Sequence, residues 1–323
     1  MSGLASIGLC LRGTPVRVTD LPEHAALDEP SRHVFESLGI DTVLVDEGSG
    51  SAELAAAAAS SALAGAGVAP ADVDALVVVQ GRVPEYLMAS EATKVQAELG
   101  AARATTFSVA DLGCVSISSA FLVAGALLDS NPAWDVVLIA HGSKPPAPRR
   151  FRYPVTVNGD GGVGVVVTRD RGPRVLDVAI ETNGEYWDLY RVDFKDKPHR
   201  EWTEECKSLK TYSFKLAIES RNRFAALNET VLARAGKTMS DVDHFVMQNL
   251  SSGAFRFYEE FFKIEFAKAC KTNLARYGHL GSMDVPLNLQ TAIESGEASP
   301  GDLVLVMNNS PVAAWSTMLV EIA

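Results

Sequence analysis

Short apolar runs alternate with helix-like segments along the chain, and part of this pattern occurs twice. The stretch from Leu63 reads LAGAGVAPADVDALVVVQ, and the stretch from Leu232 reads LARAGKTMSDVDHFVMQN. Each has a helix-like run, a glycine at its end, a turn and a short β-rich run, which is typical of a helix–strand unit. The sequence therefore predicts two copies of one α/β unit.

A second pair of apolar runs follows at almost the same offset. DVVLIA from Asp135 resembles DLVLVM from Asp302, and each run is typical of a strand buried on both faces. We therefore expect two stacked α/β lobes, an N-terminal half over residues 1–170 and a C-terminal half over residues 171–323. Coincidence between generic α/β segments is the alternative, and it does not explain the shared offset.

One segment of the C-terminal half, residues 184–210, fits neither the helical nor the strand period. It is polar with interleaved aromatic residues. We interpret it as an insertion, and insertions of this kind often shape the opening of a site.

Composition narrows the classes of function. The chain has 323 residues, of which 47% are hydrophobic and 21% charged, as in an ordinary globular protein. A net charge of −11 argues against binding to nucleic acid or to a membrane surface. We find neither a signal peptide nor an apolar run that would cross a bilayer without a charge or a break, so we expect a cytoplasmic protein.

The four cysteines show no CxxC spacing and no close pairing with histidine, so we expect no metal site. Cys114 stands out among them because it lies between the strand-like run ATTFSVADL and a helix-like run of small and apolar residues. At the start of a helix, the exposed N–H groups and the helix dipole favour a thiolate, which is the nucleophilic form. The alternative is a small buried cysteine without a chemical role.

Several ordered motifs resemble those of ketoacyl-ACP synthase III enzymes, in the thiolase superfamily. They are VPEYL from Val83, NGDGGVGVVV from Asn158, NLARYGHLGS from Asn273, and Trp315 near the end of the chain. The resemblance runs almost end to end. It implies a duplicated αβαβα five-layer thiolase fold, a homodimer, and Cys114 as the residue that carries an acyl group. The glycine run after Asn158 lacks a Walker lysine and precedes a strand, so we interpret it as a tight turn.

Two departures from the family pattern concern the remaining catalytic groups. The family's histidine lies in an IPHQAN segment, where this chain reads VMQNLS and has Gln248. The family's asparagine in RYGN is replaced by His279, and Asp284 follows five residues later. His279 can accept a proton from an attacking hydroxyl, amine or thiol, whereas Gln248 cannot. Asp284 can orient the imidazole as in a catalytic triad, or it can cap a following helix.

This arrangement resembles the ketosynthase III-like acyltransferases of polyketide and antibiotic biosynthesis. We therefore expect acyl transfer from an acyl-CoA or acyl-carrier-protein thioester, through Cys114, to a hydroxyl, amine or carrier thiol, often on a small molecule. One alternative is a condensing synthase that forms a carbon–carbon bond by decarboxylation. Another is a thiolase-fold subunit that supports a partner enzyme without catalysis. No permanently bound cofactor is expected.

Auxiliary positions follow from the same resemblance. We expect Ser116, Val312 and Arg152 to bind or orient substrate, and Arg152 matches a family arginine near the adenine or phosphate of coenzyme A. Gln248 can orient substrate in the same way, or it can only fill the space that the family's histidine leaves. Val312 belongs to the segment that replaces the family's C-terminal glycine run. In that segment Pro311 has no N–H to offer an oxyanion.

Overall fold

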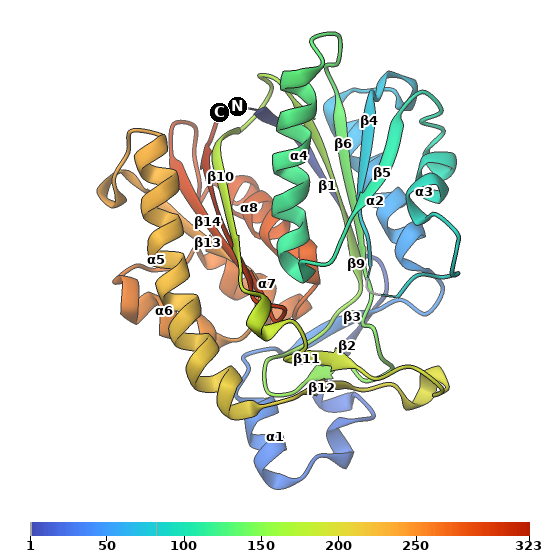
Figure 1. Cartoon of the computed structure of the whole chain (residues 1–323), viewed down its shortest axis with the longest axis vertical. Coiled ribbons are helices and arrows are strands. Elements are labelled where there is room, and N and C mark those ends of the chain that lie inside the picture. Colours follow the sequence, from blue (N-terminus) through green and yellow to red (C-terminus); the bar gives the residue numbers. More distant parts are fainter. Residues whose placement is uncertain (1, 82) are drawn as a thin grey trace.

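A continuous sheet of nine strands forms the centre of the computed structural model, which describes residues 2–81 and 83–323 (Figure 1). The strand order is β13-β14-β15-β10-β1-β9-β6-β4-β5. The bounds are β1 Ser2–Cys10, β4 Ala75–Val79, β5 Thr105–Val109, β6 Val137–Ser143, β9 Gly161–Thr168, β10 Arg174–Thr182, β13 His244–Met247, β14 Leu303–Ser310 and β15 Ala314–Glu321.

The sheet consists of two parts with the same pairing pattern, the first sheet and the second sheet. In the first, β4 pairs parallel with β6, β6 antiparallel with β9, and β9 antiparallel with β1. In the second, β13 pairs parallel with β14, β14 antiparallel with β15, and β15 antiparallel with β10. The two parts join where β1 pairs with β10 through Ser2–Val175 and Gly3–Arg174. This correspondence confirms the predicted repeat of α/β units.

Helices cover both sheets and also lie between them. Helix α2 (Ser51–Ala66) contacts β1, β6 and β9, and α5 (Ala217–Arg234) contacts β10 and β15. Helix α4 (Ser116–Ser130) contacts β4 and β6 on one side and β10 on the other, while α8 (Asp284–Glu294) contacts β1, β13 and β14. The order of layers is therefore helix, sheet, helix, sheet, helix, as expected for a thiolase fold.

The repeated helix–strand units have the predicted glycines at their turns. Helix α2 ends at Ala66, and Gly67 follows with φ of 65°. Helix α5 ends at Arg234, and Gly236 also has φ of 65°. Each unit then continues through one short 3-10 turn into its strand, β4 or β13. Because glycine adopts positive φ without steric cost, both turns follow directly from the sequence.

Smaller elements surround this core. The remaining helices are α1 Glu29–Glu36, α3 Glu91–Leu99, α6 Ser252–Phe262 and α7 Lys268–Tyr277. Within residues 2–81 and 83–323, three strand pairs lie outside the large sheet: β2 Thr14–Arg17 with β3 Thr42–Val45, β7 Phe151–Arg152 with β8 Thr156–Val157, and β11 Tyr190–Val192 with β12 Glu204–Cys206. The segment 184–210, predicted to be an insertion, contains the β11–β12 pair, and its domain assignment stays a prediction.

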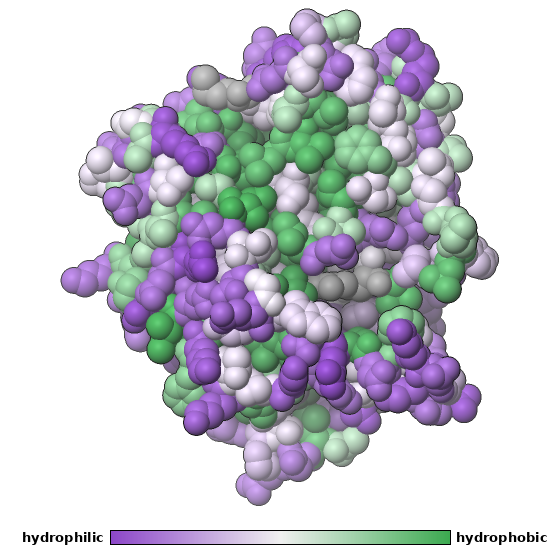
Figure 2. Space-filling view, viewed as in Figure 1, coloured by the Kyte–Doolittle hydropathy of each residue, from purple (hydrophilic) through white to green (hydrophobic). Residues whose placement is uncertain are grey.

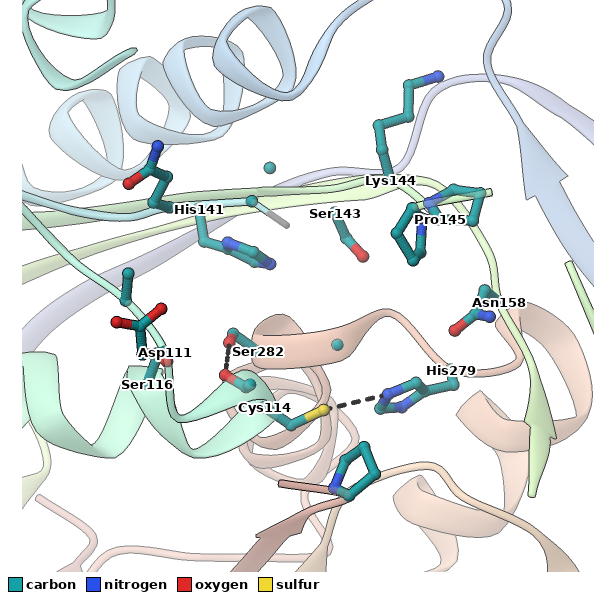
Figure 3. Close-up of a pocket in the computed structure, with 18 of the residues that line it drawn as sticks. Asp111, Cys114, Ser116, His141, Ser143, Lys144, Pro145, Asn158, His279 and Ser282 are labelled. Atoms are coloured by element: carbon teal, nitrogen blue, oxygen red, sulfur yellow. Dashed lines mark hydrogen bonds between the residues drawn. The ribbon is translucent and has the colours of Figure 1, made fainter. Parts of the chain in front are cut away.

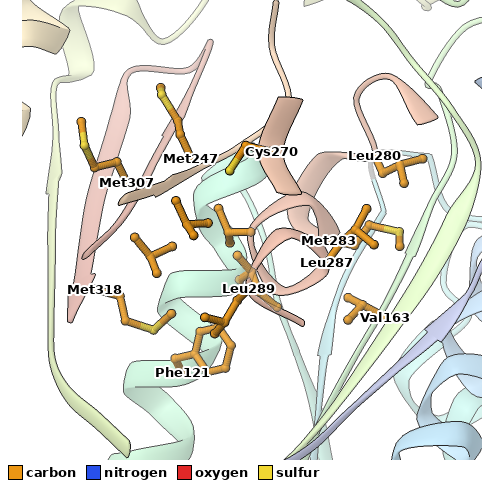
Figure 4. Packing of buried hydrophobic residues seen from close by; sticks show 14 of the residues in the cluster. Phe121, Val163, Met247, Cys270, Leu280, Met283, Leu287, Leu289, Met307 and Met318 are labelled. Carbon is orange, nitrogen blue, oxygen red and sulfur yellow. The ribbon is translucent and has the colours of Figure 1, made fainter. Parts of the chain in front are cut away.

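The core between the sheets is closely filled by side chains from both halves (Figure 4). Phe121 of α4 and Leu287 and Leu289 of α8 belong to one cluster of buried hydrophobic side chains, and all three are almost fully buried. Methionines from three strands of the second sheet complete this layer: Met247, Met307 and Met318. Burial of such side chains stabilises each by roughly 1.5–3 kcal/mol relative to exposure, so the central layer fixes α4 and α8 in place.

Most residues of helix α4 are apolar, and its polar residues are four serines and Asp129. By length and hydropathy alone, the stretch Gly113–Ser130 would qualify as a membrane-spanning helix, and half of it is buried inside the molecule. Figure 2 shows hydrophobic residues gathered over the face where α4 lies in Figure 1. Contacts with both sheets explain the apolar composition of its buried side.

Candidate active site

A short turn between β5 and α4 carries Cys114. The chain leaves β5, passes Asp111 with φ of 75°, and forms a single 3-10 turn over Gly113–Val115 before α4 begins at Ser116. Cys114 is buried, with 6% of its surface exposed. The structure thus places the cysteine at a strand-to-helix turn, as predicted.

His279 comes from the other half of the chain and meets the cysteine directly (Figure 3). Its Nε2 lies 3.2 Å from Cys114 Sγ, and its Nδ1 lies 2.6 Å from Asp284 Oδ2. The imidazole is only 1% exposed and Asp284 is fully buried. Thiol, imidazole and carboxylate therefore form one continuous line of contacts, with the geometry of a nucleophile, a base and an orienting group.

Backbone N–H groups hold the carboxylate in position. Asp284 is the first residue of α8, and its Oδ1 accepts a hydrogen bond from Leu280 N at 2.7 Å. Its Oδ2 accepts a second one from Asn249 N at 2.9 Å, in addition to the bond from His279. The carboxylate therefore ties together the loop of His279, the start of α8 and the segment after β13. Both interpretations of Asp284 from sequence, imidazole partner and helix-start residue, agree with this position.

The surroundings of Cys114 and His279 shift the pKa values of both side chains. Burial alone would raise the pKa of the Cys114 thiol, but the charge and hydrogen bond of His279, with a smaller effect of Arg152, lower it below its usual value. Burial alone would lower the pKa of His279, but Cys114 and Asp284 raise it above its usual value. Both shifts favour an imidazolium–thiolate pair, the reactive state of a nucleophilic cysteine.

Neighbouring side chains fix the backbone of the cysteine turn. Ser282 Oγ donates to the carbonyl oxygen of Gly113 at 3.1 Å, and Asn308 Nδ2 donates to the carbonyl oxygen of Cys114 at 2.9 Å. Ser282 follows His279 in the same loop, whereas Asn308 lies on β14. The second half thus holds the turn from two sides, which restricts the position of the thiol relative to the imidazole.

The backbone of His279 is fixed just as closely. Its N–H donates to Val157 O at 2.9 Å, and its carbonyl accepts from Gly159 N at 2.9 Å. A Cβ at Gly159 would lie 2.5 Å from the carbonyl oxygen of Tyr277, which real side chains do not tolerate. The glycine run after Asn158 is therefore a close-approach turn beside the site, as predicted.

A cavity of about 300 Å³ opens at Cys114 and His279. Its walls include Ser116, His141, Arg152 and Pro311. A second, more apolar groove of about 520 Å³ adjoins it and shares four residues with it: Pro84, Pro146, Arg152 and Pro311. The groove is otherwise bordered by the β11–β12 hairpin and the segment around Val83. Together they form a path from the surface to the thiol.

The auxiliary residues predicted from sequence divide into three groups. Ser116 and Arg152 line the cavity, and the Arg152 guanidinium forms a bidentate ion pair with Glu204 of β12. Val312 lines the groove and not the cavity. Gln248 lies outside both linings and its side-chain amide donates to Asn309, so its expected contact with substrate stays a prediction.

Sequence reasoning missed His141. It is the third residue from the end of β6, and it faces the cavity (Figure 3). Its Nδ1 lies 2.8 Å from the carbonyl oxygen of Val79, and burial lowers its pKa to about 4. It is therefore neutral near pH 7, with the proton on Nδ1 and a lone pair on Nε2. A histidine in the otherwise apolar run VVLIAHG was the available signal.

Among residues 2–81 and 83–323, no group of three or more His, Cys, Asp or Glu side chains is placed to hold a metal ion. All four cysteines are free thiols.

Comparison with known proteins gives one family and a set of similar structures. Residues 232–322 match the family model "3-Oxoacyl-[acyl-carrier-protein (ACP)] synthase III C terminal". A β-ketoacyl-[acyl-carrier-protein] synthase III of Aliarcobacter butzleri is 24% identical over 310 residues, covering 92% of this chain and 91% of the relative.

Two solved structures cover almost the whole chain. The 3-oxoacyl-[acyl-carrier-protein] synthase III of Aquifex aeolicus has a TM-score of 0.82 at 21% identity, covering 99% of this chain and 100% of that one. ChlB3, named as an acyltransferase, has a TM-score of 0.84 at 20% identity, covering 99% and 97%. These similarities confirm the thiolase fold.

Proposed function

Starting from a thiolase-fold chain whose sequence relatives support the ketoacyl-ACP synthase III family, we propose that the protein is an acyltransferase. In this proposal Cys114 carries an acyl group as a thioester, and His279, oriented by Asp284, activates the acceptor. The direct contact of 3.2 Å between Cys114 Sγ and His279 Nε2, with a carboxylate behind the imidazole, is the observation that carries it. The name of ChlB3 agrees with this class of reaction.

The first step loads the enzyme. The Cys114 thiolate attacks the carbonyl carbon of the donor thioester, forming a new carbon–sulfur bond to Cys114. The bond between that carbon and the donor sulfur breaks, and the departing thiolate takes the proton from the His279 imidazolium. Because the resting pair is already charged, no proton has to leave Cys114 during the attack. The step ends with an acyl-enzyme and a neutral imidazole.

The second step transfers the group. The neutral His279 Nε2 accepts the proton of a hydroxyl, amine or thiol acceptor while the acceptor atom attacks the acyl carbon. The bond to Cys114 breaks, and the thiolate is again paired with imidazolium. Asp284 holds Nδ1–H throughout, so the lone pair of Nε2 faces the thiol and the cavity. This geometry supports acyl transfer because one imidazole can serve both steps.

The donor in this proposal is a phosphopantetheine thioester, on coenzyme A or on an acyl carrier protein, as the names of the relatives suggest. The apolar groove beside the cavity has room for the pantetheine arm. Arg152 at its inner end is already paired with Glu204, which weakens its attraction for a phosphate. This pairing favours a carrier protein, whose own surface contributes to binding.

We also propose a homodimer and a cytoplasmic location. Several apolar side chains are exposed on α4 and in the loop before α3, including Leu122, Leu87 and Met88. Exposed apolar patches of this kind are typical of protein interfaces. Sedimentation or scattering measurements that find only a monomer would reject the dimer.

A condensing synthase is the second candidate function, because the sequence relatives carry that name. Such an enzyme would use Cys114 in the same way and then join the acyl group to a decarboxylated malonyl unit. The position of Gln248 counts against it, since the family's histidine at this place is replaced by a side chain directed at Asn309.

Intact-mass measurement tests the proposal. The purified protein is incubated with a panel of acyl-CoA and acyl-carrier thioesters, and we expect one acyl adduct on Cys114. Cys114→Ala should abolish it, whereas Cys270→Ala, which removes another buried thiol, should keep it. Labelling retained in Cys114→Ala would reject the assignment. A protein that no donor acylates, but that co-purifies with a ketosynthase, would instead favour a supporting subunit.

Product mass then separates transfer from condensation. Acyl transfer adds the acyl group to the acceptor and releases no carbon dioxide, whereas condensation with a malonyl thioester lengthens the chain and releases it. In His279→Ala we expect slow loading of Cys114, and any acyl-enzyme that forms should persist when an acceptor is added. Normal turnover in this variant would contradict the role of His279 as base.

A further inference from the structure

Two histidines face the same cavity, and the proposed chemistry uses only one of them. His279 is bound on both nitrogens, by Cys114 and Asp284. His141 comes from β6 on the opposite wall and is bound on Nδ1 alone, by the carbonyl oxygen of Val79 at 2.8 Å. Figure 3 shows its ring reaching into the space above Cys114. A buried polar side chain directed into a substrate cavity calls for a ligand partner.

The state of His141 defines what that partner must be. A carbonyl oxygen only accepts hydrogen bonds, so Nδ1 carries the proton and donates a hydrogen bond to the Val79 oxygen. Because the ring stays neutral at pH 7, Nε2 has a lone pair and no proton. The hydrogen bonds of the described residues give Nε2 no protein partner. The ligand atom opposite Nε2 must therefore be a hydrogen-bond donor.

The loop that carries His279 leaves room for such an atom. Gly281 has φ of 62° and no side chain, and a Cβ there would lie 3.8 Å from His141 Nε2 and 3.4 Å from Ser143 Oγ. A ligand atom near this place would be within reach of both polar groups, since hydrogen bonds span about 2.7–3.2 Å. The free volume beside Gly281 thus lies next to two polar groups of β6.

The position of His141 along the cavity indicates which part of the substrate it meets. Arg152 and Pro311 line both cavity and groove, so the donor's pantetheine arm would approach Cys114 from that end. His141, Asp111 and Ser116 line the cavity but not the groove. In Figure 3 they lie on the side of Cys114 away from Asn158 and Pro145. The acyl group, attached beyond the carbonyl carbon, would extend toward them.

We propose that His141 is a specificity-determining contact that selects a short acyl group bearing a hydroxyl or amino group near its thioester carbonyl. The cavity of about 300 Å³ limits the length of the group, because it must also hold the end of the pantetheine arm. Asp111, a second acceptor in the same region, favours the same kind of ligand. This inference rests on the proposed loading of Cys114.

Matched pairs of acyl donors test it. Lactoyl-CoA and propionyl-CoA share one carbon skeleton and differ by a hydroxyl, as do 3-hydroxybutyryl-CoA and butyryl-CoA. Loading rates of Cys114 are measured by intact mass, with both enantiomers of each hydroxyacyl donor. We expect at least one hydroxyacyl donor to load about 10-fold faster than its matched partner, the effect of one hydrogen bond in a dry site. Equal or faster loading of the plain acyl group in both pairs would overturn the inference.

Two substitutions assign the preference to His141. In His141→Asn the amide nitrogen can take over the bond to Val79, but no atom reaches the place of Nε2, so the preference should fall to about 1-fold. In His141→Gln the longer amide can place an oxygen near that position, and part of the preference should return. A full preference in His141→Asn would overturn the inference. The absence of any Cys114 adduct with both matched pairs of donors and with the wider panel would instead reject the proposed function itself.

Discussion

Two buried cysteines lie near helix starts in this protein, and the pKa values of their thiols are shifted in opposite directions. Cys114 lies in the turn before α4, and Cys270 is the third residue of α7. Both side chains are buried. Burial raises the pKa of Cys270 to about 12, whereas the charge of His279 outweighs burial at Cys114 and lowers its pKa.

The difference shows that neither burial nor a helix start makes a cysteine reactive. Cys270 lies among core side chains such as Met247, and none of the described residues that act on its thiol is a cation (Figure 4). Cys114 meets an imidazole that a buried carboxylate holds in its charged form. The group in contact with a cysteine therefore decides whether its thiol ionises. The two histidines of the cavity show the same dependence on their partners. His279 has a carboxylate partner and a raised pKa, while His141 has only a carbonyl and a lowered one.

The largest expected effect comes from removing the charge of Asp284. Asp284→Asn keeps the shape of the side chain but no longer stabilises the imidazolium, so the pKa of His279 should fall and the imidazole should lose its orienting partner. We expect turnover to drop by about 10³–10⁴-fold, as for the loss of the carboxylate in other triads. Steady-state kinetics with the best donor from the mass panel would measure it.

A second His–Asp pair provides the control for this change. His244 Nε2 lies 3.0 Å from Asp302 Oδ2 on a partly exposed part of the surface. Asp302→Asn should leave turnover within about two-fold, because exposed pairs contribute little. If Asp284→Asn behaved like Asp302→Asn, the carboxylate would have no role in activating the cysteine.

The next effect concerns the two thiols directly. At pH 7 iodoacetamide should alkylate Cys114 at least about 10³-fold faster than Cys270, because only the thiolate reacts and Cys270 stays protonated. Peptide mapping after timed alkylation gives both rates from one sample. Raising the pH to 9 should speed the reaction at Cys114 less than at an ordinary thiol, whose thiolate fraction is still rising. Similar rates at both cysteines would contradict the assigned ionisation.

The sequence was sufficient to predict the fold and to identify Cys114, His279 and Asp284 as neighbours in the site. Paired apolar runs predicted the duplicated sheet, and the motifs around Cys114 and His279 brought together residues 165 positions apart. Both succeeded because strand burial, helix ends and glycine turns leave local patterns in the chain.

The positions of Gln248 and His141 could not be predicted in the same way. Gln248 occupies the family's histidine position, but its direction depends on Asn309, which lies 61 residues away. His141 had no motif, and its exposure to the cavity depends on how β6 lies against the His279 loop. Contacts between distant segments set both, and no local period records them.

A smaller effect should appear in the stability of the protein in acid. His141 has a pKa of about 4 in the folded state and about 6.5 when unfolded, so between these values the unfolded chain binds more protons. Its contribution is complete above about pH 6.5 and is lost as the pH falls toward 4. Between pH 7 and 4.5, wild type should therefore lose about 2–3 kcal/mol more unfolding free energy than His141→Asn.

Urea unfolding at the two pH values measures this difference. His279 does not add to it, because a raised pKa gives stability that is present in acid and is lost only as the pH rises. Parallel acid losses in wild type and His141→Asn would show that His141 is not held neutral by burial.

The smallest effect should follow from Cys270→Ala, which completes the comparison of the two thiols. The substitution removes one sulfur atom from a site with no exposed surface, and we expect the unfolding free energy to fall by about 1 kcal/mol through lost contacts and a small void. The rate of acyl loading should not change, because Cys270 contacts core side chains and not the cavity. Chemical denaturation and intact-mass loading on one preparation test both statements. A loading rate that fell with the stability unchanged would mean that the second thiol takes part in the chemistry, and that the partner of a cysteine does not decide its role.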